Sequence, residues 1–74
     1  MENYRSTSGK QSGVTAYEIG TDFIKVQFIK GSIYEYTYSR DGKNNVEIMK
    51  AKARAQNGLA TFISQNRIKG RLIS

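Results

Sequence analysis

Three runs between Val14 and Tyr38 have the hydrophobic pattern of β-strands. They are VTAYEI (14–19), FIKVQFI (23–29) and IYEYTY (33–38), and turn residues follow each of them. β-Branched and aromatic residues dominate the runs, and in the second run apolar residues alternate with polar ones, as they do when successive side chains point to opposite faces. Because the links are short, consecutive strands should pair antiparallel. The pattern therefore predicts a three-stranded antiparallel meander.

The period changes to that of a helix after the polar stretch SRDGKNN (39–45). The segment VEIMKAKARAQ (46–56) contains strong helix formers and neither Gly nor Pro. Asn44 or Asn45 is expected to cap this helix, because an Asn side-chain oxygen accepts a free backbone N–H of the first turn. The buried face of the helix is predicted to contain Val46, Met49 and Ala53, which recur at helical spacing.

A second, shorter helix is predicted for LATFISQ (59–65), with Leu59, Phe62 and Ile63 as its buried stripe. The preceding Asn57–Gly58 supplies the left-handed residue that ends many helices. The chain then continues as the basic tail RIKGRLIS (67–74), which Ile68 or Leu72 is expected to hold against the rest of the protein.

These elements predict one small α+β domain, a β-β-β-α-α arrangement in which two helices pack on one face of the meander. Two helices cover one face of a small sheet, so the other face should remain open to solvent. Residues 1–12 are rich in Ser, Thr and Gly and cannot bury enough apolar surface to offset the cost of ordering. We therefore expect a flexible N-terminal arm over 1–12 and a single domain over 13–74.

Tyr34, Tyr36 and Tyr38 lie at two-residue spacing and should share one face of the third strand. A two-residue loop at Lys30–Gly31 would place Val26 opposite Glu35 and bury the carboxylate, which is costly without a partner. A three-residue loop over residues 30–32 pairs Val26 with Tyr36 instead, and also Phe28 with Tyr34 and Ile24 with Tyr38. We prefer this second register, in which the tyrosines turn toward the core and Glu35 toward solvent. The alternative is an exposed tyrosine platform on which bases stack.

The composition argues against catalysis and against metal binding. The 74 residues include no Cys and no His, which removes thiolate chemistry, the commonest metal ligand and the usual general base. The carboxylates are single and scattered, and no phosphate-binding loop or nucleophile motif is present. No apolar run approaches a membrane span of about 20 residues, and the N-terminus lacks the apolar region of a secretory signal. We expect a cytoplasmic protein that is not an enzyme and has no cofactor, metal or membrane partner.

The charge is concentrated in the C-terminal half. Residues 1–42 carry five cations and five anions, whereas residues 43–74 carry seven cations and only Glu47, so the whole net charge of +6 lies there. Such asymmetry indicates an anionic partner, above all RNA, whose phosphates cationic side chains contact without sequence preference. The candidate contact residues are Lys25, Lys50, Arg54, Arg67, Lys69 and Arg71. The simpler interpretation is a solvated basic surface that maintains solubility.

A second hypothesis concerns the open sheet face. The preferred register places apolar residues there, namely Phe23, Ile29 and Ile33, and exposed apolar clusters often mark contacts with other proteins. The chain would then be a protein-interaction module that binds a larger partner or a second copy of itself.

The order of motifs resembles the KTSC domain, a small bacterial domain that occurs at the C-terminus of some lysyl-tRNA synthetases and as a free-standing protein. The resemblance covers about residues 12–72 and rests on VxFxxGSxYxY at 26–36, followed by EIMKAKARAQNGLATFISQNRIKGR at 47–71. Its landmarks are Tyr34, Tyr36, Gly58, Leu59, Phe62 and Ile63, with Arg67 or Lys69 after them. The chain differs at Leu72, where an aromatic residue is usual. The resemblance implies a binding module of unknown function, with tRNA-like RNA as the expected ligand.

Overall fold

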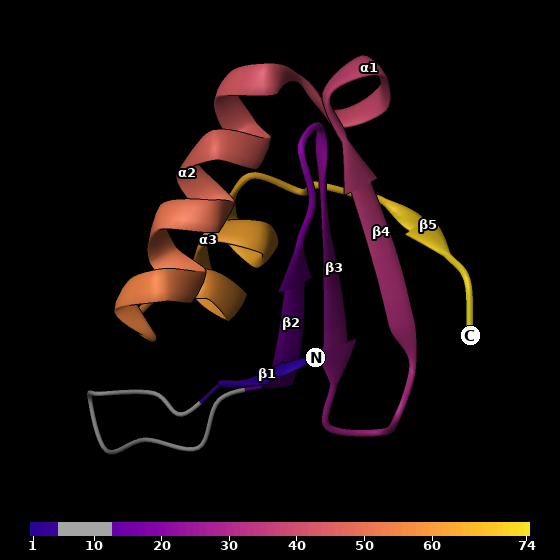
Figure 1. Ribbon diagram of the computed structural model, residues 1–74, viewed down its shortest axis with the longest axis vertical. Helices are drawn as coiled ribbons and strands as arrows, with labels where there is room; N and C mark the ends of the chain where they lie inside the picture. The colour runs from indigo at the N-terminus through magenta and orange to yellow at the C-terminus, as the bar shows by residue number, and fades with distance from the viewer. Residues whose placement is uncertain (5–12) are drawn as a thin grey trace.

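The protein is a small α+β fold with a five-stranded antiparallel sheet and three helices (Figure 1). The two longer helices lie against one face of the sheet, and the first helix, a single turn, lies at the end of the fourth strand. The computed structural model describes residues 1–4 and 13–74. The strands follow one another across the sheet in chain order and are β1 (Glu2–Asn3), β2 (Val14–Ile19), β3 (Phe23–Phe28), β4 (Ile33–Thr37) and β5 (Arg71–Leu72). The helices are α1 (Tyr38–Asp41), α2 (Lys43–Ala55) and α3 (Leu59–Gln65). None of the helices among these residues is long and apolar enough to cross a membrane.

The predicted meander is present as β2, β3 and β4, but the sequence pattern missed both edge strands and α1. β5 pairs with β4, so that Leu72 lies opposite Tyr34 and Arg71 opposite Glu35. A two-residue strand gives no periodic signal in a sequence, because its pairing depends on an edge that is formed elsewhere. Part of the predicted basic tail, Arg71–Leu72, is therefore the fifth strand of the sheet.

The start of the chain differs from the predicted flexible arm. Glu2 and Asn3 pair with Tyr17 and Ala16 of β2, and the Tyr4 side chain is only 5% exposed. The Tyr4 ring lies edge-on to the ring of Tyr17 at a centroid distance of 6.4 Å. Its hydroxyl accepts the backbone N–H of Leu59 at 3.1 Å, which satisfies a donor in the first turn of α3. Residues 5–12 of the predicted arm lie outside the described residues.

The two main helices lie where the pattern placed them, although the predicted cap of the first was wrong. α2 begins three residues earlier than predicted, after Gly42, and no side chain caps it. The Asn45 amide instead donates to the carbonyl of Asp41 at 2.9 Å. α2 ends at Ala55, and its C-cap residue Gln56 adopts the left-handed conformation one residue before the predicted Asn57–Gly58 stop. α3 has the predicted bounds.

The register between β3 and β4 differs from the predicted one by two residues. Val26 lies opposite Tyr34 and Ile24 opposite Tyr36, because the loop consists of residues 29–31 instead of 30–32. A shift of two residues returns every side chain to the same face, so the predicted inside and outside are correct. Tyr36 is 2% exposed, which excludes it from an exposed stacking platform. Glu35 lies on the open face opposite Lys25.

The core lies between the sheet and the helices. The largest fully buried side chains are Tyr36, Ile24, Met49, Leu59, Val26 and Val46. Tyr38, the third residue of the tyrosine row, belongs to α1 and not to β4, so it is not part of the strand pattern. Tyr34 is partly buried, with its ring edge-on to Phe28 at 5.6 Å.

Candidate phosphate-binding site

Three exposed cations surround one concave site at the end of β4. Arg40 comes from α1, and Arg67 and Lys69 come from the segment between α3 and β5. Asp41, Asn45, Asn66, Ile68 and Gly70 complete the lining of this basic cleft, whose volume is about 380 Å³. Two of its cations were predicted from the sequence, whereas Arg40 was missed, because Asp41 beside it cancelled its charge in the count over residues 1–42.

The Asp41 carboxylate holds the two walls of the basic cleft together. One oxygen accepts the backbone N–H of Thr37 at 3.0 Å, and the other accepts the backbone N–H of Gly70 at 3.2 Å. The Asp41 side chain is only 5% exposed, and the nearest guanidinium nitrogen of Arg40 lies 3.9 Å away. Asp41 therefore joins α1 to the segment 66–70, and its carboxylate turns inward to these N–H groups. The Arg40 guanidinium, which is exposed, donates one hydrogen bond to the carbonyl of Glu35 at 3.2 Å.

The backbone of the segment 66–70 is fixed by packing on both sides of Arg67 and Lys69. Ile68 packs against the core, and its N–H donates to the carbonyl of Ile63 at 3.1 Å. Gly70 lies directly against the ring of Tyr36, so that a Cβ at Gly70 would be 2.6 Å from the ring. Arg67 itself has a positive φ of 51°. Arg67 and Lys69 therefore extend from a fixed backbone on either side of the partly buried Ile68.

The electrostatics of the basic cleft favour an anion. Three cations and one carboxylate give a local charge of 3 − 1 = +2. Arg40, Arg67 and Lys69 are all exposed, so they can bind a phosphate without the desolvation cost of a buried charge. Burial, followed by the charge of Asp41 and then by Tyr34, raises the pKa of Tyr36 to about 12. The Tyr36 phenol therefore stays neutral even in moderately alkaline solution and adds no negative charge beside the cleft.

Lys50 is not part of this surface, contrary to the prediction. It is 5% exposed, and its amino group donates to the carbonyl of Thr21 at 3.0 Å and to the hydroxyl of Tyr38 at 3.1 Å. Glu47 lies 3.1 Å from the same nitrogen and also accepts the Tyr38 hydroxyl. Burial alone would lower the pKa of Lys50, but the hydrogen bonds with Tyr38 and Glu47 raise it above its usual value. Lys50 links α2 to α1 and to the β2–β3 turn.

Lys25 and Arg71 lie on the open face in a row of alternating charges. The register places Glu18 beside Lys25, Lys25 beside Glu35 and Glu35 beside Arg71 on four consecutive strands. Lys25 and Glu18 are 3.8 Å apart. We call these four residues the charged row. Its charges sum to 2 − 2 = 0, so these two cations do not extend the positive potential of the basic cleft.

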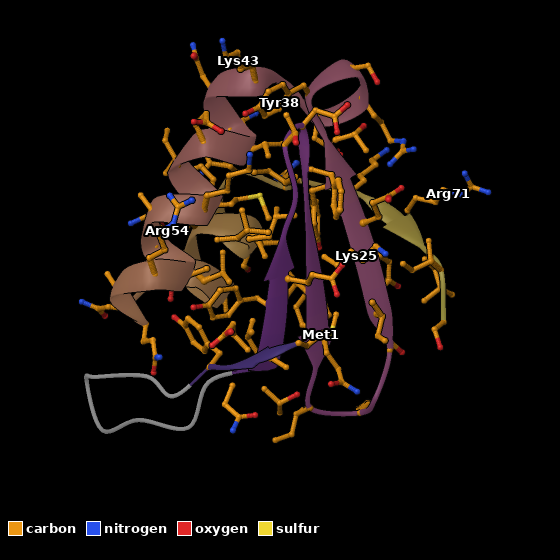
Figure 2. All side chains as sticks on the ribbon, in the orientation of Figure 1. Met1, Lys25, Tyr38, Lys43, Arg54 and Arg71 are labelled. Carbon is orange, nitrogen blue, oxygen red and sulfur yellow. The ribbon has the colours of Figure 1, made fainter. Side chains whose placement is uncertain are left out.

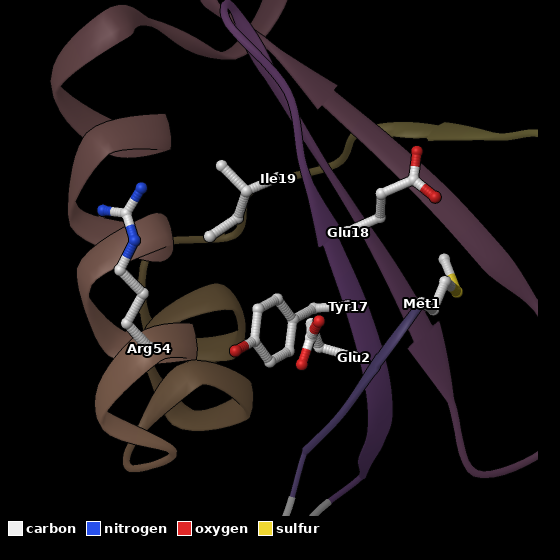
Figure 3. Close-up of a pocket in the computed structure, with 6 residues that line it drawn as sticks. All are labelled: Met1, Glu2, Tyr17, Glu18, Ile19 and Arg54. Atoms are coloured by element: carbon white, nitrogen blue, oxygen red, sulfur yellow. The ribbon is translucent and has the colours of Figure 1, made fainter.

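Arg54 lies apart from the other predicted cations. Figure 2 shows it on α2, with Arg71 on the opposite side of the molecule. It lines a second cavity of about 460 Å³ together with Met1, Glu2, Tyr17, Glu18 and Ile19. In Figure 3, Arg54, Tyr17 and Ile19 border the space between α2 and β2, whereas Glu18 points away from α2. The lining of this cavity includes two glutamates and one arginine, so its charge does not favour a phosphate.

The residues that carry the resemblance to the KTSC domain pack in or against the core or shape the backbone. Tyr36, Leu59 and Ile63 are buried, and Tyr34 and Phe62 pack against the core. Gly58 has a φ of 77° and precedes the first residue of α3. Within residues 1–4 and 13–74, no three Asp, Glu, His or Cys side chains are placed to hold a metal ion.

Comparisons of this chain with protein-family models, with curated proteins and with solved structures found no match.

Proposed function

We propose that this chain is a small non-catalytic module that binds RNA by holding phosphate groups in the basic cleft. The observation that carries the proposal is that Arg40, Arg67 and Lys69 line one concave site, where the carboxylate of Asp41 already accepts two backbone N–H groups. Guanidinium groups match phosphate oxygens in geometry, and their contacts are nearly independent of base sequence. The resemblance to a domain found beside a tRNA-charging enzyme supports the same ligand.

The number of phosphates in contact distinguishes this proposal from one based on net charge alone. For single-stranded RNA, the logarithm of the affinity falls with the logarithm of the salt concentration with a slope of about −0.7 per phosphate contact. Three cations predict a slope of about −2. If all six cations chosen from the sequence bound phosphates, the slope would be about −4.

Fluorescence anisotropy with a labelled single-stranded RNA at several salt concentrations measures this slope. Arg67→Ala should weaken binding for all RNA sequences alike and reduce the slope by nearly one contact. Arg54→Ala is the matched control, because it removes the same charge outside the basic cleft and should leave the slope unchanged. If the Arg54 variant lost RNA binding while the Arg67 variant bound normally, the RNA would bind outside the basic cleft. Absence of RNA binding by the unaltered chain at low salt would reject the proposal.

Self-association is a second candidate function, and the exposed apolar residues favour it. Ile29, Leu72 and Ile73 are 52%, 57% and 42% exposed, and they lie at the β3–β4 loop and along β5. The sequence placed two other residues with Ile29 on the open face. These residues, Phe23 and Ile33, are both half-buried.

A further inference from the structure

The charged row is complementary in charge to a reversed copy of itself. Its order across the sheet is Glu18, Lys25, Glu35 and Arg71, or minus, plus, minus, plus. An even number of alternating charges becomes its own complement when its order is reversed. Two identical rows that meet in opposite directions therefore place every charge opposite one of the other sign.

We propose that two copies of this chain associate through their open faces, about a twofold axis that runs parallel to the strands. This axis reverses the order of the strands in the second copy, so that Glu18 faces the second copy's Arg71 and Lys25 faces its Glu35. A twofold axis across the strands would instead place each charge opposite itself, and like charges in contact are strongly disfavoured. The charged row thus selects one of the two ways in which the sheets can stack.

The neighbouring rows are compatible with the same axis. Gln27 lies beside Ile33, and the N–H of Ile73 donates to the carbonyl of Ile33 at 2.9 Å, so that Ile33 and Ile73 are neighbours across β4 and β5. Reversal of the strand order brings Ile33 against the second copy's Gln27 and covers Ile73, which is 42% exposed. On the other side of the charged row, Phe23 meets the second copy's Thr37. On each side of the charged row, one apolar side chain of each copy, Ile33 or Phe23, is covered by an uncharged polar side chain of the other copy.

The size of the open face indicates a weak, reversible dimer. Five strands spaced by about 4.8 Å, with about five residues of 3.3 Å each, give a face of roughly 400 Å² per copy. The two copies together would bury roughly 800 Å², which is below the range of stable complexes and typical of transient ones. The charged row then mainly determines the orientation of the two copies, and the flanking apolar residues supply the affinity.

A charge-exchange experiment tests the facing of Lys25 and Glu35. Lys25→Glu changes the row to minus, minus, minus, plus, and Glu35→Lys changes it to minus, plus, plus, plus. Each single variant places two like-charged pairs across its own homodimer and should weaken dimerisation about tenfold or more. A mixture of the two variants restores opposite charges at all four positions, so the heterodimer should form about as tightly as the unaltered dimer.

Sedimentation equilibrium measures each association up to about 1 mM, and circular dichroism of each variant verifies that it is folded. Lys43→Glu and Glu2→Lys carry the same charge changes away from the charged row and should dimerise as the unaltered chain does. The proposal is overturned if the unaltered chain is monomeric at about 1 mM, if the two single variants dimerise normally, or if their mixture forms no heterodimer. Because the basic cleft lies outside the open face, RNA binding by these variants is measured independently.

Discussion

The contact between Gly70 and Tyr36 holds the segment of the basic cleft that carries Arg67 and Lys69, and it can be tested by Gly70→Ala. Gly70 has a φ of 63°, and a Cβ there would approach the Tyr36 ring to 2.6 Å. The left-handed conformation costs an alanine about 1–2 kcal/mol, and overpacking against a buried ring costs about 1–3 kcal/mol more. The variant should therefore lose about 2–5 kcal/mol of its free energy of unfolding.

Gly31→Ala is the matched control, because it separates the two contributions. Gly31 has a φ of 94°, but nothing lies within 4 Å of a Cβ built on it. Gly31→Ala should therefore lower the free energy of unfolding by about 1–2 kcal/mol, the cost of the positive φ without any overpacking. The effect of alanine on the entropy of the unfolded chain is common to both variants, so it largely cancels in the comparison.

Urea unfolding followed by circular dichroism gives both free energies. A chain of 74 residues is stable by about 4–11 kcal/mol in total, so the loss at Gly70 is a large fraction of it. The melting temperature should fall by about 4–8 °C for each kcal/mol lost. Equal destabilisation of the Gly70 and Gly31 variants would show that Tyr36 does not support the segment 66–70, and the account of the basic cleft given above would be wrong.

Three further outcomes are expected elsewhere in the chain. Lys50→Met should reduce the free energy of unfolding by about 1–3 kcal/mol, since it leaves buried acceptors without a donor, and it should change RNA affinity by less than about twofold because Lys50 is buried. Tyr4→Phe should cost about 1–3 kcal/mol in urea unfolding, because the N–H of Leu59 loses its acceptor. Hydrogen bonds from Tyr38 and then Lys50 lower the pKa of Glu47 below 4.5. The contribution of ionised Glu47 to the free energy of unfolding is therefore fully present above pH 4.5 and lost as pH falls through the lowered pKa. Plots of the free energy of unfolding against pH for Glu47→Gln and for the unaltered chain should therefore converge at acid pH.

The strands and helices whose hydrophobic residues recur at a regular spacing were predictable from the sequence. The edge strands, which form only by pairing with a strand distant in the sequence, were not. The three central strands and α3 follow from alternation and helical spacing, and the core side of β4 follows from the cost of burying Glu35. The exact pairing did not follow, because residues 29–31 and 30–32 are both reasonable loops around Gly31 and leave the same faces. β1 and β5 were missed since two residues carry no period.

The basic surface was predictable only in part, because the number of charges in a segment does not show where their side chains lie in the fold. Lys50 and Arg54 are one helical turn apart in the sequence, yet one is buried beneath Tyr38 and the other lines a different cavity. Arg40 was hidden by its neighbour Asp41, whose carboxylate in fact turns inward to the backbone. The available signal for the burial of Lys50 was its place between the apolar positions Met49 and Ala53 of the helix, with the opposite charge of Glu47 one turn away.

The two proposed surfaces also constrain each other. A twofold axis parallel to the strands keeps the ends of the strands together, so the end of β4 that leads into α1 lies at the same end of both copies. Each basic cleft is built around α1, so a dimer of this kind would present its two clefts at one end and not at opposite ends. One RNA that contacts both clefts would gain affinity without any new contact, because the second contact forms at a high effective concentration. A weak dimer interface is therefore sufficient, since an RNA bound to two clefts would itself hold the copies together.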